Sequence, residues 1–538
     1  MNASISYSHI IVGGGAAGCV LACRLSENKD FKILLIEAGG KGRFDPTLKV
    51  PLMTAILLRG RRRLWNFKTM PEHGLNNRTV DLPRGKVLGG STSVNGMVYA
   101  RGLSLDYDFW AQNGMPGWSW ESVQPYFLKS EDFQDKEFLE NHNIGGELAV
   151  SKRVMPVSPL ADAFVEAGIA AGHNRVSDFN SPNPEGFGYY HFNIRNGRRE
   201  SSYTAFLKGV ESRQNLTVKT GLEVSRIIFS NNKAVGVEVS KGSKISQIRA
   251  EAEVILAGGA IGSPTILLRS GIGPANDLIR IGIKPKLDSP NVGKNLQDHV
   301  LVRVSHKTSS SVSLHKLTRI DLASISFLRA LVFGTGPMNV FPLEAGAYMR
   351  GPGADIPNIQ SAFLPALTTA TIRFNPFSKL QNSSAGFMAN ASVMRPLSRG
   401  SLQLTGDSLS NKVEIRLNYL SEPQDLETLV DGVELLRDVF SQKPFDPYRG
   451  EEIGPGISIK SRSGLREWVK REANTVHHLS GSCRMGVDEE SVTDPQLRVR
   501  GITGLRVADA SIFPSITSAN TAAPTIMVAE RAVDFISG

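Results

Sequence analysis

The fold of this chain is decided by the stretch HIIVGGGAAGCVLACRLSE, residues 9–27, together with KILLIEAGG, residues 32–40. The first stretch begins as a short apolar strand, passes through a glycine turn and continues with the apolar spacing of an amphipathic helix. The second stretch has the length and the Ile and Leu content of a buried strand. The two stretches therefore predict a strand–helix–strand unit at the start of a Rossmann-like α/β domain.

Three glycines of this unit, Gly13, Gly15 and Gly18, have the spacing G-x-G-x-x-G that is typical of dinucleotide binding. The first glycine permits a tight turn, the second lets a diphosphate approach the backbone, and the third allows the helix to pack closely on the strand. Glu37 follows Gly18 by 19 residues, at the end of the second strand, where its carboxylate can accept hydrogen bonds from ribose hydroxyls. Because this requires a free 2′-hydroxyl, NADP is disfavoured, whereas FAD and NAD both remain open.

Composition indicates a globular chain of more than one domain. With 538 residues, 41% of them hydrophobic, the chain can bury two cores of ordinary size. Its formal net charge of +10 is spread along the sequence, and the densest basic cluster is RGRRR, residues 59–63. A solvated basic loop explains this cluster more simply than an anionic partner or a membrane surface does. No motif supports nucleic-acid binding, so we expect no nucleic-acid partner.

The three cysteines, Cys19, Cys23 and Cys483, are too few for a disulfide framework, and their spacing fits no zinc site. We therefore expect no bound metal and a reducing compartment. The first strand begins too near the N-terminus to leave room for a secretory signal, and no apolar run of about 20 residues follows. These features favour a cytoplasmic protein without a transmembrane segment, either free or peripheral to the inner membrane.

Four further stretches carry a family resemblance: LPRGKVLGGSTSVNGMVYARGLSLDYDFW at 82–110, GAIGSPTILLRSGIG at 259–273, HLSGSCRMG at 478–486 and GLRVADASIFPSITSANTAAPTIMVAERAVDFI at 504–536. They resemble the signature segments of the glucose-methanol-choline (GMC) flavoprotein oxidoreductases, in the branch of bacterial alcohol, choline and sorbose dehydrogenases. The matches run from one end of the chain to the other. The resemblance implies FAD rather than NAD as the cofactor.

The resemblance also implies which residues surround FAD. They are small or polar residues of the glycine turn, the first signature and the C-terminal block, and small side chains let backbone N–H groups reach an extended anionic ligand: Ala16, Ala17, Gly89, Gly90, Ser91, Asn95, Gly96, Met97, Val98, Val224, Asp509, Ala510, Asn520 and Thr521, beside the fingerprint residues Gly13, Gly15, Gly18 and Glu37. Some family members tether the flavin through a histidine just before the Asn of the first signature. Val94 stands at that position here, so we expect FAD to be held noncovalently.

The same resemblance implies a fold of two parts. The flavin motifs fall in separated segments, so residues 1–150, 201–300 and 476–538 are expected to form a discontinuous FAD-binding domain. Residues 151–200 and 301–475 lack these motifs and are expected to form a substrate-binding domain. Alternating segments such as GSLQLTG, residues 400–406, and KVEIRLNYL, residues 412–420, favour an antiparallel sheet over the flavin in that second domain.

The sequence VHHLSGSCRMG, residues 476–486, contains the expected catalytic base. Adjacent residues of an extended segment point to opposite faces, so at most one of the two histidines is expected to serve the site. The resemblance selects His478 and leaves His477 to point away, and it implies Asn520 as the partner that binds the substrate oxygen. His478 would accept the hydroxyl proton of a primary or secondary alcohol while hydride passes to flavin N5, with a pH midpoint near 6–7 if its pKa is ordinary.

Several alternatives stay open at this stage. The electron acceptor can be oxygen or a quinone, and the alcohol is not identified. The family resemblance also covers hydroxynitrile lyases that keep FAD without redox chemistry, so a non-redox lyase is a second hypothesis. A noncatalytic flavin-binding protein is a third. Glu344 either meets a polar or cationic substrate or forms a structural ion pair. Cys483 is either a redox-sensitive thiol or a small buried residue.

Overall fold

A computed structural model describes residues 6–135, 140–151, 158–182, 184–308, 312–367 and 385–538. The expected strand–helix–strand unit is present as β1 (Tyr7–Val12), α1 (Ala16–Leu25) and β2 (Ile33–Glu37). β1 and β2 run parallel, with Ile10 opposite Leu34, and every residue of β2 is buried. This confirms the α/β fold class predicted from the opening stretch.

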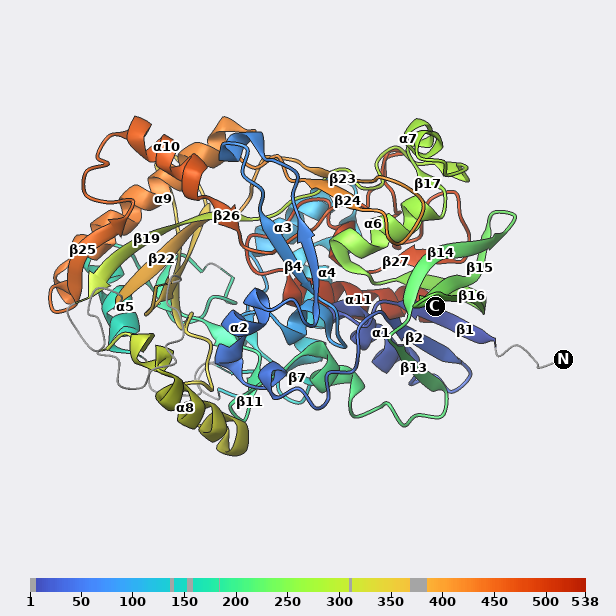
Figure 1. Cartoon of the computed structure of the whole chain (residues 1–538), viewed down its shortest axis with the longest axis horizontal. Helices are drawn as coiled ribbons and strands as arrows, with labels where there is room; N and C mark the ends of the chain where they lie inside the picture. Colours follow the sequence, from blue (N-terminus) through green and yellow to red (C-terminus); the bar gives the residue numbers. More distant parts are fainter. Residues whose placement is uncertain (1–5, 136–139, 152–157, 183, 309–311, 368–384) are drawn as a thin grey trace.

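A seven-stranded sheet is built around this unit. Its parallel part has the order β13–β2–β1–β16–β27, and the long β16 continues into an antiparallel part with β15 and β14. The helices α1, α11 and α4 pack together beside the parallel part (Figure 1). The bounds are β13 (Leu216–Thr220), β14 (Glu223–Ser230), β15 (Lys233–Lys241), β16 (Lys244–Leu256), β27 (Leu505–Val507), α4 (Trp120–Ser130) and α11 (Ala522–Ser537).

A second, eight-stranded and mostly antiparallel sheet lies at the other end of the molecule (Figure 1), with the order β25–β19–β22–β21–β20–β9–β8 and β26 paired to β19. The helices α5, α9 and α10 contact this sheet on the side away from the first sheet. The bounds are β8 (Arg175–Val176), β9 (Gly186–Tyr189), β19 (Val300–Thr308), β20 (Ala345–Met349), β21 (Ile359–Leu364), β22 (Gly386–Val393), β25 (Arg449–Gly454), β26 (Asn474–Thr475), α5 (Pro159–Ala170), α9 (Pro423–Ser441) and α10 (Arg462–Glu472).

One expectation about this second sheet is wrong. The alternating segments predicted to belong to it form β23 (Ser401–Leu404) and β24 (Val413–Arg416), which pair only with each other in the described part of the chain. Their alternation reflects a two-stranded ribbon with one buried face, since Leu402, Leu404 and Ile415 are buried. Alternation alone does not tell which sheet a strand joins.

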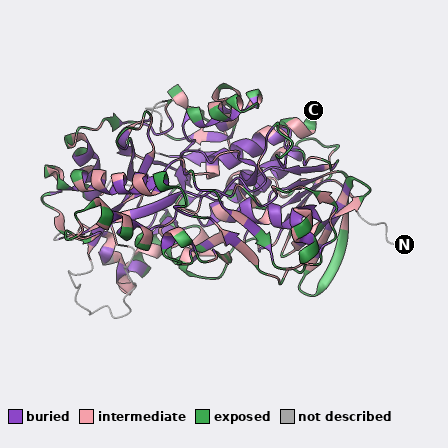
Figure 2. Cartoon of the chain, turned by 90° about the horizontal axis from the view of Figure 1, so that it is seen from above, coloured by how far each residue is buried: buried purple, intermediate pink, exposed green. Residues whose placement is uncertain are grey.

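One hydrophobic core connects the two sheets. A single cluster of buried side chains includes Ile10 of β1 together with Val302 of β19 and Ala389 of β22, and buried residues run along the whole length of the molecule (Figure 2). Among the described residues, no helix is long and apolar enough to cross a membrane. The division into domains at the residue numbers given above stays a prediction.

Candidate active site

A cavity of about 1140 Å³ lies between the two sheets. It is lined by the carboxyl ends of the first sheet, at Val12 and Glu37, and by one face of the second sheet, at Arg303 and Asn390. Ligands of parallel α/β sheets bind at the carboxyl ends of the strands. Because the volume exceeds the range of about 300–1,000 Å³ usual for drug-sized ligands, the cavity has room for a large cofactor and a substrate together.

Most of the residues expected around FAD border this cavity: Gly13, Gly15, Ala16, Ala17, Glu37, Gly90, Ser91, Asn95, Gly96, Met97, Val98, Val224, Asp509, Ala510, Asn520 and Thr521. Gly18 and Gly89 do not. A Cβ on Gly18 would lie 1.8 Å from the carbonyl oxygen of Gly13, so its role is the close packing of helix on strand. Gly89 has φ of 85°, and its turn brings its N–H to the carbonyl of Gly14 at 2.7 Å.

The ends of three helices make the cavity suitable for an anion. α1, α6 (Gly259–Arg269) and α11 all begin at the cavity wall, and none has a side-chain cap at its N-terminus. Apart from the N–H of Gly259, which donates to Asp509, the first N–H groups of these helices have no side-chain acceptor among the described residues and can meet a ligand. The helix dipoles favour negative charge there. A Cβ on Gly259 or Gly262 would meet nothing within 4 Å, so open space adjoins the backbone. This cradle fits the diphosphate and the flavin ring of FAD.

Glu37 links the glycine turn to the end of β2. Its Oε2 accepts a hydrogen bond from the N–H of Gly14 at 2.8 Å, and its Oε1 accepts one from the N–H of Gly39 at 2.7 Å. Burial raises the pKa of Glu37 to about 7, although these two N–H groups lower it. Each carboxylate oxygen keeps a second lone pair for a ribose hydroxyl. The carboxylate therefore holds the turn in addition to the role expected from the sequence.

Asp509 closes the opposite side of the cofactor region. Its Oδ2 accepts hydrogen bonds from the N–H of Gly259 at 2.8 Å and from Oγ of Ser263 at 2.6 Å, while its Oδ1 accepts from the N–H of Ser511 at 2.8 Å. These contacts hold the start of α6 against the C-terminal block. They position the open backbone of Gly259 at the cavity wall.

His478 lies at the meeting point of the two sheets, and hydrogen bonds on both ring nitrogens fix its orientation. Its Nδ1 is 2.8 Å from Nδ1 of His299, and its Nε2 is 3.1 Å from Nδ2 of Asn520. Its backbone N–H donates to Oδ1 of Asp298 at 2.6 Å. The structure thus brings together the two residues expected to act on the substrate, and Asn520 borders the cavity beside His478.

The hydrogen bonds of His299 assign the protonation of His478. Nε2 of His299 is 2.9 Å from the carbonyl oxygen of Met394, which only accepts, so this nitrogen carries the hydrogen. A neutral imidazole has one N–H, so Nδ1 of His299 is an acceptor, and Nδ1 of His478 must donate to it. Nε2 of His478 is then left with a lone pair toward Asn520 and the cavity. An imidazole in this state is a proton acceptor.

Burial keeps these imidazoles neutral. It lowers the pKa of His299 to about 4 and places the pKa of His478 well below its ordinary value, with smaller contributions to the latter from His299, Arg84 and His477. The sequence analysis missed His299. The only available signal was its place in NLQDH, residues 295–299, directly before an alternating strand, and that signal does not indicate a contact with residue 478.

The expectation that His477 points away because the backbone is extended is wrong in its premise. His477 has φ of 67°, outside the extended region, and it borders the cavity as His478 does. Its N–H donates to Oγ1 of Thr475 at 2.7 Å, and its carbonyl accepts from Arg84 at 2.7 Å. Burial, followed by Arg84 and Arg303, lowers its pKa to about 3. What distinguishes His478 is its contact with His299 and Asn520.

Val94, Glu344 and Cys483 lie in three different environments. Val94 borders the cavity with an aliphatic side chain, 2% exposed. Glu344 does not border the cavity, and its carboxylate accepts a hydrogen bond from the N–H of Ser158 at 3.0 Å, which favours the structural reading. Cys483 is fully buried, and burial holds its pKa well above the ordinary value, so it stays a thiol.

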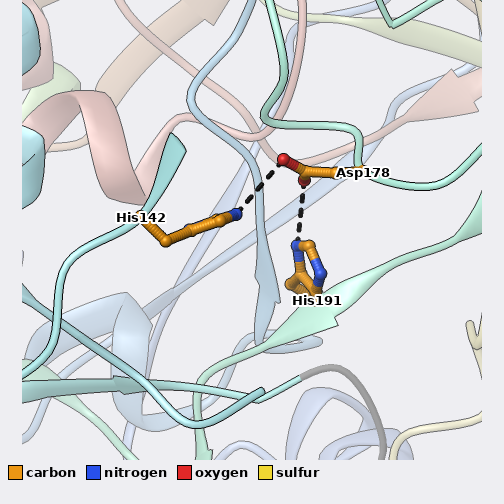
Figure 3. Close-up of side chains that lie close together, drawn as sticks. All are labelled: His142, Asp178 and His191. Atoms are coloured by element: carbon orange, nitrogen blue, oxygen red, sulfur yellow. Dashed lines mark hydrogen bonds and ion pairs between the residues drawn. The ribbon is translucent and has the colours of Figure 1, made fainter. Parts of the chain in front are cut away.

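A second group of titratable side chains, His142, Asp178 and His191, lies close together (Figure 3), and none of the three borders the cavity. Nε2 of His142 is 3.2 Å from Asp178, and its Nδ1 is 2.7 Å from Glu131, which also pairs with Arg101 at 2.5 Å. Burial lowers the pKa of His142, but hydrogen bonds to Asp178 and Glu131 outweigh burial and raise it. Together with Glu131 and Arg101, this group forms a buried network of hydrogen bonds and ion pairs.

Comparison with known proteins identifies the family. Two family models, each described as GMC oxidoreductase, match residues 7–301 and 396–529. The chain belongs to the GMC oxidoreductase family. The chain is 39% identical to the oxygen-dependent choline dehydrogenase of Photobacterium profundum, over 99% of this chain and 93% of the relative. It is 41% identical to that of Pseudomonas savastanoi pv. phaseolicola, over 100% of this chain and 94% of the relative.

Solved structures of this family show the same fold. Pyridoxine 4-oxidase from Mesorbium loti has a TM-score of 0.87 and 31% identity, covering 98% of this chain and 99% of its own. Formate oxidase from Aspergillus oryzae RIB40 has a TM-score of 0.91 and 25% identity, covering 99% and 98%. This GMC oxidoreductase is therefore a flavoprotein enzyme that acts on CH–OH donors with FAD as cofactor.

Proposed function

We propose that this enzyme oxidises a primary or secondary alcohol to the aldehyde or ketone, with His478 as the general base. The observation that carries the proposal is the hydrogen-bond series from the carbonyl of Met394 through His299 to His478, which leaves Nε2 of His478 unprotonated beside Asn520. A base must be deprotonated and within reach of the proton that it removes. The first condition is met here, and an alcohol hydroxyl that replaces the amide of Asn520 at Nε2 of His478 would meet the second.

In this proposal each residue has a distinct task. Nε2 of His478 accepts the hydroxyl proton, and the N–H of Asn520 donates to the substrate oxygen and fixes its orientation. FAD supplies the acceptor for the hydride that leaves the carbinol carbon. His299 is a positioning residue that holds the N–H of His478 on the far side of the ring.

We propose that FAD is held noncovalently. Val94 offers no nucleophile at the position where tethered relatives carry histidine, and the three open helix ends and Glu37 supply contacts enough for a dianionic ligand. The residues that would hold it are those of the cavity wall named above, with Gly18 and Gly89 shaping the turns. The division into a discontinuous FAD-binding domain and a substrate-binding domain belongs to the same proposal.

The electron acceptor is proposed to be oxygen or a quinone. Relatives over nearly the full length are named oxygen-dependent choline dehydrogenases, which supports a small alcohol as donor and oxygen as one acceptor. If the acceptor is a membrane quinone, the enzyme would contact the inner membrane. Side chains of α8 (Ile320–Phe333) that are apolar and exposed, Ile325, Leu328, Val332 and Phe333, are the surface on which to look for such contact.

The proposal is tested by anaerobic rapid mixing of the FAD-loaded enzyme with an alcohol, following the loss of oxidised flavin absorbance. We expect His478→Ala to slow flavin reduction by about 10²–10⁴-fold, the usual contribution of a positioned general base. His477→Ala is the matched control and should cost far less, because within the described part of the chain His477 forms no hydrogen bond with Asn520.

Each outcome of this experiment has a clear meaning. Equal losses in the two variants, or a larger loss in His477→Ala, would show that the base is assigned to the wrong residue. Cyanohydrin cleavage without any bleaching of the flavin by alcohols would favour the lyase reading. Binding of alcohols without bleaching and without cleavage would favour a noncatalytic flavoprotein.

A further inference from the structure

Among the residues that the structure describes, the face of the second sheet that borders the cavity contains one charged side chain. Three neighbouring strands, β19, β21 and β22, contribute six residues to this wall: Leu301, Arg303, Ala362, Leu364, Met388 and Asn390. Five of them are neutral, and Arg303 carries a permanent positive charge. Arg303 lies opposite Asn390 in the antiparallel pairing of β19 with β22. The amide oxygen of Asn390 accepts from the N–H of Ala362, so its NH₂ group is a second donor beside Arg303.

Arg303 has no protein group to balance its charge. In the described ranges of the chain, its guanidinium forms no hydrogen bond and no ion pair, and burial lowers its pKa. The other basic groups of the cavity lie outside these three strands. Lys68 pairs with Asp81 at 3.1 Å, and Arg84 donates to the carbonyl of His477 at 2.7 Å. Arg269, at the end of α6, and Lys412, before β24, border other parts of the cavity. A partly buried guanidinium at the cavity wall without a protein partner is available to an anionic ligand.

The carboxylates of the cavity cannot serve as that partner, because each is already engaged. Glu37 and Asp509 accept backbone hydrogen bonds as described above. Glu223 pairs with Lys86 at 3.7 Å, and Glu414 pairs with Arg416 at 3.1 Å. The segments 309–311 and 368–384, which lie outside the described residues and adjoin β19, β21 and β22 in the sequence, contain no Asp or Glu. The wall thus offers a positive charge and, within the described part, no free negative one.

The sheet register places Arg303 at a defined distance from the reacting end. Leu301 and Gln360 both lie opposite Ser392, in one row across the sheet, and Nε2 of Gln360 is 3.5 Å from Oδ1 of Asn520. Arg303 belongs to the next row on the same face, about 6.8 Å further along the strand. A ligand with its hydroxyl at Asn520 and His478 can therefore reach Arg303 across a short, flat spacer such as an aromatic ring.

Resting on the proposed function, we propose that Arg303 and Asn390 form a carboxylate-binding subsite, and that the substrate is an alcohol bearing a carboxylate across such a spacer. A guanidinium recognises a carboxylate with two parallel hydrogen bonds. The relatives named above take their names from choline, whose quaternary ammonium would meet the like charge of Arg303 here. This chain should therefore prefer an alcohol with a negative charge to one with a positive charge such as choline.

The test compares three alcohols on the FAD-loaded enzyme: 4-(hydroxymethyl)benzoate, benzyl alcohol and 4-(trimethylammonio)benzyl alcohol. We expect kcat/KM to be highest for the carboxylate. Arg303→Ala should lower kcat/KM for the carboxylate by about 10- to 100-fold, the range of a charged hydrogen bond, and change that for benzyl alcohol by less than about threefold. Arg303→Glu should favour the trimethylammonium alcohol. Arg280→Ala, which removes a charge on the exposed α7 (Ala275–Arg280), is the matched control and should change neither.

A binding measurement separates this proposal from the proposed chemistry. By calorimetry, 4-methylbenzoate, which has no hydroxyl, should bind the native enzyme about tenfold or more tightly than 4-methylbenzamide, and Arg303→Ala should remove the difference. If that holds while no alcohol bleaches the flavin, the subsite stands and the proposed function fails. If the two ligands bind equally, the subsite is absent even where benzyl alcohol bleaches the flavin. Loss of FAD from Arg303→Ala, measured by absorbance, would assign Arg303 to the cofactor and overturn the proposal.

Discussion

At the scale of single residues, the environment of His478 determines the pH range in which the enzyme works. The base acts only when neutral, and burial places the pKa of His478 well below its ordinary value. The rate of flavin reduction should therefore be constant across neutral pH and fall only as the pH drops through this lowered pKa. We therefore expect the midpoint to lie below the value near 6–7 expected from the sequence, which does not reveal burial. Rapid-mixing rates between pH 5 and 8 test this, because a midpoint near 6–7 would fall inside that range.

His299 supplies the control for the same experiment. His299→Phe removes the acceptor of the Nδ1 hydrogen of His478, so part of the population should carry its hydrogen on Nε2 and lose activity. We expect the plateau rate to fall about tenfold or more, less than the loss in His478→Ala. His299→Gln should recover most of the rate, because its NH₂ can donate to Met394 and its oxygen can accept from His478. No recovery in this variant would reduce His299 to a packing residue.

At the scale of elements, the sequence predicts what depends on local pattern. The spacing of glycines and apolar residues in 9–40 fixes β1, α1 and β2, because tight turns and helix–strand packing need those residue types. His299 directly precedes β19, and His478 follows β26 by three residues. The two histidines are 179 residues apart in the sequence, so no local pattern predicts their contact. The cavity wall of β19 and β22 likewise follows from strand register, which the single sequence does not specify.

Glu37, at the end of β2, both stabilises the backbone turns beside it and is expected to bind the cofactor ribose. Glu37→Ala should lower FAD occupancy, because it removes the acceptor of two N–H groups of the glycine turns as well as that of the ribose. Glu37→Gln keeps one acceptor and should lose less. Occupancy is measured as flavin released into the supernatant after acid precipitation. Flavin retained in the native pellet would show a covalent attachment, and unchanged occupancy in Glu37→Ala would remove Glu37 from the cofactor site.

At the scale of the whole molecule, buried neutral histidines should make stability depend on pH. The pKa values of His9 and His299 are lowered to about 4, and that of His477 to about 3, in each case chiefly by burial. The unfolded chain binds protons at these positions below about pH 6.5, and the folded chain does not. Their contribution to stability is therefore fully present above pH 6.5 and is lost as the pH falls toward 4. Glu37, with its pKa raised to about 7, binds a proton in the folded chain at a higher pH than in the unfolded chain. It therefore offsets the contribution of about one histidine in this pH range.

The free energy of unfolding should thus fall by about 1.4 kcal/mol per pH unit for each such histidine in this window. Urea unfolding at saturating FAD, at several pH values between 7 and 4.5, measures the slope. His9 is the position to vary, because it lies in β1 against Phe31 and does not border the cavity. His9→Phe keeps an aromatic ring there and removes one titrating group. The slope of its unfolding free energy against pH should therefore be smaller by about 1.4 kcal/mol per pH unit, the contribution of one proton. A variant slope equal to the native one would mean that His9 is protonated in the fold as readily as in the unfolded chain.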